Sequence, residues 1–179
     1  MGKNAKPMSE DGVVSFESTL LLMDSPLWGA FIPVTYEIAS FYKERGIQRL
    51  VCEINYTLHL HCALMPGGNH SFFILMNKNN VKKLKIKPGD SVHVMLAPDH
   101  SQYGMPLGEE LEALLEEDFN FAHHFEKLTP GKQRNLIYLI NKAKSSEIRL
   151  RTAVAVAGHL DANNGKLDFK MLNEALKNK

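Results

Sequence analysis

The sequence predicts an α+β protein, with a small β-barrel carrying short helices over residues 12–103 and an all-α module over residues 106–162. A polar tail or short helix is expected over residues 163–179. Before Asp99, short runs of β-branched and apolar residues alternate with turn signals, a pattern typical of strands. After Asp99, apolar residues recur every three or four positions, as on one face of a helix. A length of 179 residues suits one large domain or two small ones.

The first part is expected to begin with one long strand from Val13 to Met23. A second strand, Leu27 to Val34, contains Pro33, which suits a strand end or an edge. Residues 48–55 and 57–65 then predict a hairpin.

Two segments of this part are similar in layout. Residues 31–54 predict a strand, a helix and a strand, and residues 73–96 predict the same series with a shorter helix. Each unit alone leaves one sheet face exposed, so two units related by an approximate two-fold axis could close on each other as a barrel. Chance similarity between two such units is the alternative.

The second part predicts four helices and a weaker fifth. Pro106 is expected to begin the first, Phe119 to Phe125 lie in the second, and Thr129-Pro130 opens the third. Ser145 or Ser146 caps the fourth, and residues 163–179 end in a marginal helix or a tail.

Composition excludes several classes. A net charge of +1 gives no global attraction to nucleic acid or to an anionic membrane. Two cysteines are too few for a disulfide framework. We also expect no cofactor. The N-terminus has no apolar signal region, and no apolar run approaches the ~20 residues that span a bilayer. We therefore expect a cytoplasmic protein without membrane insertion.

Cys52, His59 and His61 are the best candidates for metal ligands. A two-residue hairpin tip at Asn55-Tyr56 would place all three on one sheet face and Cys62 on the other face. A one-residue slip would remove Cys52 from the cluster, and histidines packed on a half-polar face are the simpler reading. We therefore expect no metal site.

Two basic clusters remain as candidate binding sites. Lys82, Lys83, Lys85 and Lys87 form a run without an acid, which could neutralise phosphates of a nucleic acid or could be a solvated surface. The run has no interleaved aromatic or arginine side chain for reading bases.

The second cluster, Lys144, Arg149 and Arg151, lies at the junction of the third and fourth helices. It could bind an anion or a partner, or Arg149 and Glu147 could anchor the corner through ion pairs. No constellation of catalytic residues stands out, so we expect no enzyme.

Motif order makes the chain similar to a known family. Trp28, residues 64–70 and residues 87–92 resemble the small β-barrel domain of unknown function that precedes YdeI/OmpD-associated modules, and residues 106–161 resemble the module itself. The resemblance implies an AbrB-like double-split barrel and a link to bacteriocin or antimicrobial-peptide tolerance.

This sequence departs from the family pattern in both parts. Tyr56 replaces the usual Gly of the hairpin tip, which predicts a longer or different loop because a type I′ turn would force positive φ on Tyr56. Ile148 and Thr152 replace residues of the basic helical motif, which weakens any binding role inferred from that motif.

The sequence therefore favours a non-enzymatic binding or stress-tolerance protein of the YdeI/OmpD-associated type. Its partner would be a peptide, a protein or a small anionic ligand. An AbrB-like nucleic-acid binder that uses the lysine-rich face is the alternative. A metal protein or enzyme built on the Cys52 face ranks last.

Overall fold

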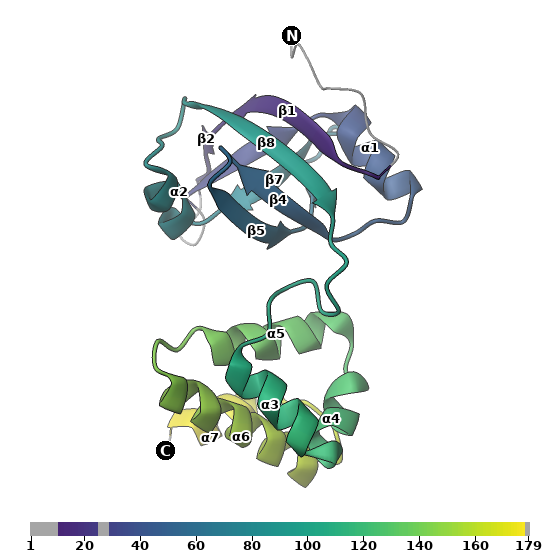
Figure 1. Cartoon of the computed structure of the whole chain (residues 1–179), viewed down its shortest axis with the longest axis vertical. Helices are drawn as coiled ribbons and strands as arrows, with labels where there is room; N and C mark the ends of the chain where they lie inside the picture. Colours follow the sequence, from purple (N-terminus) through teal and green to yellow (C-terminus); the bar gives the residue numbers. More distant parts are fainter. Residues whose placement is uncertain (1–10, 25–28, 178–179) are drawn as a thin grey trace. The chain divides into compact units, whose positions relative to one another are not determined.

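Strands build the first part of the chain and helices build the second, which confirms the α+β class (Figure 1). The structure is a computed structural model that describes residues 11–24 and 29–177. Trp28 and the start of the strand expected at Leu27 therefore lie outside the described residues. The chain divides between His100 and Ser101 into two compact units, and each is described by itself.

The strand unit contains two antiparallel sheets of four strands that share one apolar core. One sheet has the order β1-β8-β4-β5 and comprises β1 (Val14–Thr19), β4 (Leu50–Ile54), β5 (Leu58–Cys62) and β8 (Ser91–Pro98). The other has the order β2-β3-β7-β6 and comprises β2 (Leu21–Leu22), β3 (Ala30–Val34), β6 (Met65–Pro66) and β7 (Phe72–Met76). Two short helices are α1 (Tyr36–Glu44) and α2 (Lys78–Leu84). The ladders keep the sheets separate, so a closed barrel stays a prediction.

The long strand expected from Val13 to Met23 is divided at Leu20. β1 pairs with β8, whereas β2 pairs with β3 in the other sheet. Leu20 is fully buried between them, and its backbone bonds to the turn before β8. Apolar pattern alone could not locate this change of sheet. Pro33 lies opposite Phe73 of β7, near the end of β3 and beyond the short β2 ladder, which agrees with the expected position at a strand end.

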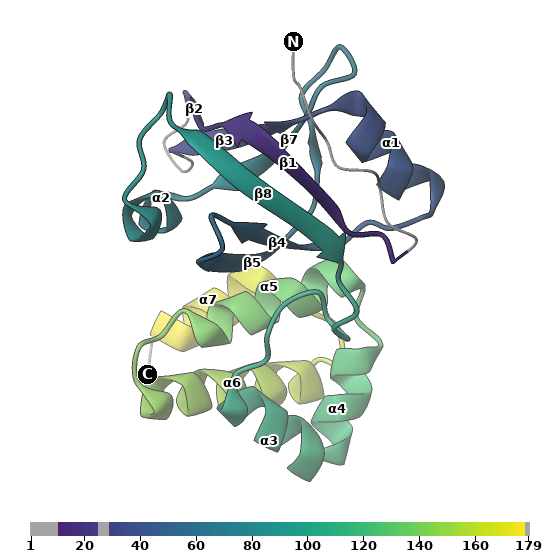
Figure 2. The ribbon, with the colours of Figure 1, turned by 45° about the horizontal axis from the view of Figure 1, so that its top comes forward.

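The two strand-helix-strand units are present as β3-α1-β4 and β7-α2-β8. β3 pairs with β7 and β4 pairs with β8, with Ile32 opposite Ile74 and Glu53 opposite Met95. In both pairs the residue numbers differ by 42. Exchanging the units by this offset reproduces every pairing of the β3-β7 ladder and the three pairings of the β4-β8 ladder centred on Glu53, as expected for an approximate two-fold axis. Accordingly, α1 and α2 lie at opposite ends of the strand unit (Figures 1 and 2).

The β4-β5 hairpin has a different register from the one needed for a metal cluster. Ile54 pairs with Leu58, so the loop holds three residues, and the expectation of a longer loop is confirmed. Asn55 and Tyr56 both have positive φ, and the Thr57 N–H donates to the Ile54 carbonyl at 3.1 Å. Tyr56 thus adopts the conformation that a glycine usually takes here. The extra residue shifts every cross-strand pair by one.

Both cysteines face the core of the strand unit. Leu50 pairs with Cys62 and Cys52 with Leu60, which places Cys62 on the same face as Cys52. The expectation that they lie on opposite faces was therefore wrong. Both are free and buried, and a hydrogen bond with Cys62 together with burial raises the pKa of Cys52.

Five helices form the second unit around a separate apolar core. They are α3 (Glu109–Glu117), α4 (Phe119–Glu126), α5 (Pro130–Asn141), α6 (Ser146–Ala162) and α7 (Phe169–Lys177). Pro106 does not begin the first helix; Gly108 caps α3, and the Pro106 carbonyl accepts a hydrogen bond from the Asn141 side chain at 3.0 Å. The side chains of Asp118 and Ser145 cap α4 and α6. Among the described helices, none has the length and apolar character to cross a bilayer.

Candidate anion-binding site

A cavity of about 760 Å³ opens among α5, α6 and α7 of the helical unit. Three cationic side chains line it: Lys142 after α5, Arg151 on α6 and Lys177 on α7. Within residues 11–24 and 29–177, none of the three takes part in an ion pair. Apolar side chains form much of the remaining lining: Leu139, Ala143, Ile148, Ala155 and Leu176. The cavity therefore combines unpaired positive charge with an apolar surface.

Helical periodicity explains which α6 residues meet the cavity. Arg151 and Thr152 lie three and four positions after Ile148, and Ala155 lies four and three positions after them, so all four reach one side of the helix. Arg149 lies two positions from Arg151, and residues at this spacing point in different directions. The two arginines of the expected basic cluster consequently belong to different environments.

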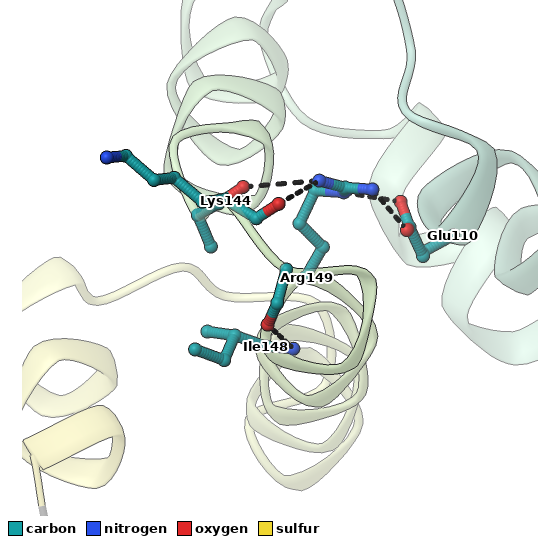
Figure 3. A network of polar contacts seen from close by, with 6 residues as sticks. Glu110, Lys144, Ile148 and Arg149 are labelled. Carbon is teal, nitrogen blue, oxygen red and sulfur yellow. Dashed lines mark hydrogen bonds and ion pairs between the residues drawn. The ribbon is translucent and has the colours of Figure 1, made fainter.

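The Arg149 side chain is bound inside the protein (Figure 3). Its Nε and Nη2 donate to the two carboxylate oxygens of Glu110 at 2.8 and 2.7 Å. Its Nη1 donates to the carbonyls of Ala143 and Lys144, just beyond α5, at 3.3 and 3.2 Å. Arg149 thus joins the start of α3 to the α5-α6 corner. The anchoring partner is Glu110 on α3, whereas Glu147 was expected.

Glu110 is buried and depends on this arginine. The hydrogen bonds from Arg149, followed by those from Ser146 and from its own backbone, lower the pKa of Glu110 to about 2. The bidentate geometry fits a carboxylate to a guanidinium, which is the strongest form of such pairs. Sequence reasoning missed Glu110 because it lies in an acidic helix that has the composition of a solvated surface.

Lys144 contributes its backbone, not its side chain, to this corner. Its carbonyl accepts from Arg149, while its ammonium extends away from the guanidinium (Figure 3). The Lys144 side chain is exposed and does not line the cavity. Of the three residues expected to bind an anion, Arg151 alone lines this cavity. Anion binding by any of the three stays a prediction.

α7 forms one wall of the cavity and is fixed by its first turn. The Asp168 carboxylate accepts from the backbone N–H groups of Lys170 and Met171 at 2.8 and 3.1 Å, which lowers the pKa of Asp168. The Asp168 N–H donates to Nε2 of buried His159 on α6 at 3.2 Å. Leu172 is fully buried against the helical core. These contacts hold α7 beside α6.

The second basic cluster lies in the strand unit. Lys82 and Lys83 are in the last turn of α2, and Lys85 follows it with φ of 54°. These three side chains and that of Lys87 are exposed. The helix itself has no buried residue among those described. Nucleic-acid binding by this surface stays a prediction.

The possible metal ligands are separated by the hairpin register. Cys52 is fully buried on the core face, whereas His59 and His61 lie on the outer face of the same sheet. The clustering of Cys52, His59 and His61 on one sheet face, which a two-residue hairpin tip would have given, is therefore wrong. No group of three or more potential metal-ligating side chains occurs in the part of the chain that the structure describes.

Both histidines instead meet carboxylates. His61 Nδ1 lies 2.7 Å from Asp99 Oδ2, and His59 Nε2 lies 3.3 Å from Glu53 Oε2. A third such pair joins His93 to Glu17 at 2.7 Å on the same sheet. These pairs support a structural role for the histidines of this sheet.

Comparison with protein families divides the chain in the same way as its fold. A model described as Domain of unknown function (DUF1905) matches residues 16–96, and a model described as Bacteriocin-protection, YdeI or OmpD-Associated matches residues 105–162. Residues 105–162 thus match the YdeI/OmpD-associated module, and the domain of unknown function precedes it. The resemblance seen in the sequence is thereby confirmed. No curated protein matches the chain.

The family match and the cavity do not have the same extent. α5 and α6 lie within the matched residues, whereas α7 begins at Phe169, after the match ends at residue 162. Sequence reasoning did not assign α7 to a site. The spacing of Leu172 and Leu176 was the one available signal for a helix with an inward face.

Proposed function

We propose that this YdeI/OmpD-associated protein is a non-enzymatic binding protein that takes up a small anionic ligand in the α5-α6-α7 cavity. Three cations that form no ion pair with any described residue surround one concave, partly apolar surface, and they carry the proposal. The volume of about 760 Å³ falls within the roughly 300–1,000 Å³ of small-molecule sites. The bacteriocin-protection-like role suggested by the family would then depend on ligand binding.

The lining of the cavity favours binding over catalysis. As far as the described residues go, it contains no Asp, Glu, His, Cys or Ser side chain. General acid-base and nucleophilic catalysis rely mainly on such groups, placed within hydrogen-bond reach of one another. Lysine and arginine can hold an anion without further machinery.

Charge also favours a small anion over a cationic peptide. Antimicrobial peptides are typically rich in Lys and Arg on their polar face, and the three cations of the cavity would repel them. A tolerance role would therefore act through an anionic ligand and not through capture of the peptide in this cavity.

Complementation tests this proposal. A strain that lacks the protein would receive the wild type, Arg151→Gln or Lys132→Gln and then be challenged with bacteriocins. Lys132 is exposed on α5 and does not line the cavity, so it controls for the loss of one positive charge. We expect tolerance with the wild type and Lys132→Gln, and reduced tolerance with Arg151→Gln. Full tolerance with Arg151→Gln would contradict the proposal.

A nucleic-acid-binding role of the α2 surface is the second candidate. The exposure of Lys82, Lys83, Lys85 and Lys87 supports it. Gel shifts with duplex DNA at rising salt are the test, since phosphate contacts weaken steeply with ionic strength. Absence of binding at low salt would exclude this role.

We further propose that the strand unit is a double-split barrel and that the protein acts in the cytoplasm. The shared offset of the two central ladders supports a barrel assembled from two related halves. Two free, buried cysteines in contact with each other suit a reducing compartment.

A further inference from the structure

We infer that the ligand of the cavity is an anionic amphiphile: a carboxylate head joined to a single unbranched hydrocarbon chain, with α7 as the wall that recognises the chain. This inference rests on the proposed function and names its ligand class. Two features of the lining carry it, the placement of the cations and the exposure of apolar side chains between them.

The cations come from three different helices or their ends. Arg151 projects from α6, Lys142 follows the last residue of α5, and Lys177 ends α7. Because the described residues contribute no carboxylate to the lining, a single anionic head is the complementary charge for these cations. The guanidinium of Arg151 can bind a carboxylate through two parallel hydrogen bonds.

The apolar part of the lining is too large for a head group alone. Ile148 is 44% exposed although it lies beside the cavity, and Leu139 and Leu176 are half-buried there. Ala143 and Ala155 have short side chains and leave room between the larger ones. A hydrocarbon chain laid over this surface would remove it from water, which is favourable in proportion to the apolar area covered.

α7 supplies both kinds of contact. Leu176 and Lys177 are adjacent, and Asn173 stands three and four positions before them, so all three reach one side of the helix. Leu172 anchors the helix to the core. Leu176 packs partly against the same core, and its remaining surface lines the cavity beside Lys177. Because α7 lies beyond the family match, selectivity for the hydrocarbon chain of the ligand would be a property of this protein and not of the whole family.

Calorimetric titration of the full chain with defined probes tests the ligand class. The probes are hexanoate, octanoate and decanoate below their micelle concentrations, acetate and inorganic phosphate as heads without a chain, and decyltrimethylammonium as a chain with the opposite charge. We expect saturable binding of decanoate with an affinity at least tenfold above that of hexanoate. The upper limit is about fourfold per buried methylene.

Two matched pairs of variants locate the binding. Ile148→Gln and Leu150→Gln alter α6 side chains of similar exposure, 44% and 47%, but only the first lines the cavity. Arg151→Gln and Lys132→Gln each remove one exposed positive charge, but only Arg151 lines the cavity. We expect Ile148→Gln and Arg151→Gln each to weaken decanoate binding at least fivefold, and both controls to retain it. Leu176→Gln, checked for wild-type circular dichroism, extends the test to α7.

The outcomes separate this inference from the proposed function. If phosphate or acetate binds as tightly as decanoate and Ile148→Gln has no effect, the cavity binds anions but the amphiphile is wrong. If decyltrimethylammonium binds as well as decanoate, the anionic head is wrong. If no anion binds and Arg151→Gln restores tolerance, both proposals fail.

Discussion

The two sides of α6 use similar arginines in opposite ways. Toward α3, Arg149 is bound to Glu110 and to two carbonyls, so its donors are satisfied inside the protein. Toward α7, Arg151 lines a cavity together with two other cations and has no acidic partner among the described residues. A paired charge fixes the fold, whereas an unpaired charge at a cavity is available to a ligand.

The largest difference is expected in stability. Arg149→Met leaves the buried Glu110 carboxylate without its cationic partner, which is destabilising, and we expect the Tm to fall by several degrees or more. Arg151→Gln changes an exposed side chain and should stay within about 0.5 kcal/mol of the wild type. Thermal unfolding by circular dichroism measures both. Equal Tm values for the two variants would contradict the assigned roles.

The Arg149–Glu110 pair should also make the stability of the protein depend on pH in the acid range. The folded-state pKa of Glu110 is about 2, below its ordinary value of 4.5, so this carboxylate contributes stability above about pH 4.5. That contribution is lost as the pH falls from about 4.5 toward 2. Denaturant midpoints across this range should fall for the wild type and for Arg151→Gln. Arg149→Met should lose less over the same range, and an unchanged acid profile in that variant would contradict the assignment.

A smaller effect is expected from the cap of α7. Asp168→Ala removes the acceptor of two backbone N–H groups, so amides in the first turn of α7 should exchange faster with solvent. Because α7 is a wall of the cavity, decanoate should bind two- to threefold more weakly, on the order of the cost of a lost cap. Lys166→Ala in the same connecting turn is the control. Unchanged exchange in α7 would show that Asp168 does not hold the helix.

The smallest effect is expected at Lys144. Its backbone carbonyl accepts from Arg149, and a substitution of the side chain leaves that bond in place. Lys144→Gln should therefore keep both the Tm and the affinity for decanoate. If Lys144→Gln weakened decanoate binding as much as Arg151→Gln, the Lys144 side chain would have to contact the ligand, and the assignment would be contradicted.

Much of the strand unit could be predicted from the sequence because its signals are local. Short apolar runs and turn residues located the two strand-helix-strand units, and the bounds of β4 and β7 follow closely. A longer hairpin loop was expected so that Tyr56 would avoid positive φ, but Tyr56 has a φ of 56° in the three-residue loop, so the sequence argument did not determine the register. The register of this hairpin decides the faces of Cys52, Cys62 and both histidines.

The site in the helical unit was predicted only in part. Basic residues marked the α5-α6 corner, but Arg149 and Arg151 were expected in one cluster although residues two positions apart on a helix point in different directions. The side that carries the cavity depends on how α3 and α7 pack against α6, which spacing along one helix does not reveal. Lys177 and Leu176 enter the site only through that packing.

One NMR measurement tests the difference between the two arginines directly. The side-chain Nε–Hε resonances of Arg149 and Arg151 can be followed in one spectrum while decanoate is added to the full chain. We predict that the Arg151 resonance and the methyl groups of Ile148 and Leu176 shift with a common saturation curve, while Arg149 stays in place. A shift of Arg149 with no change at Arg151 would contradict the account, as would unchanged resonances of both arginines.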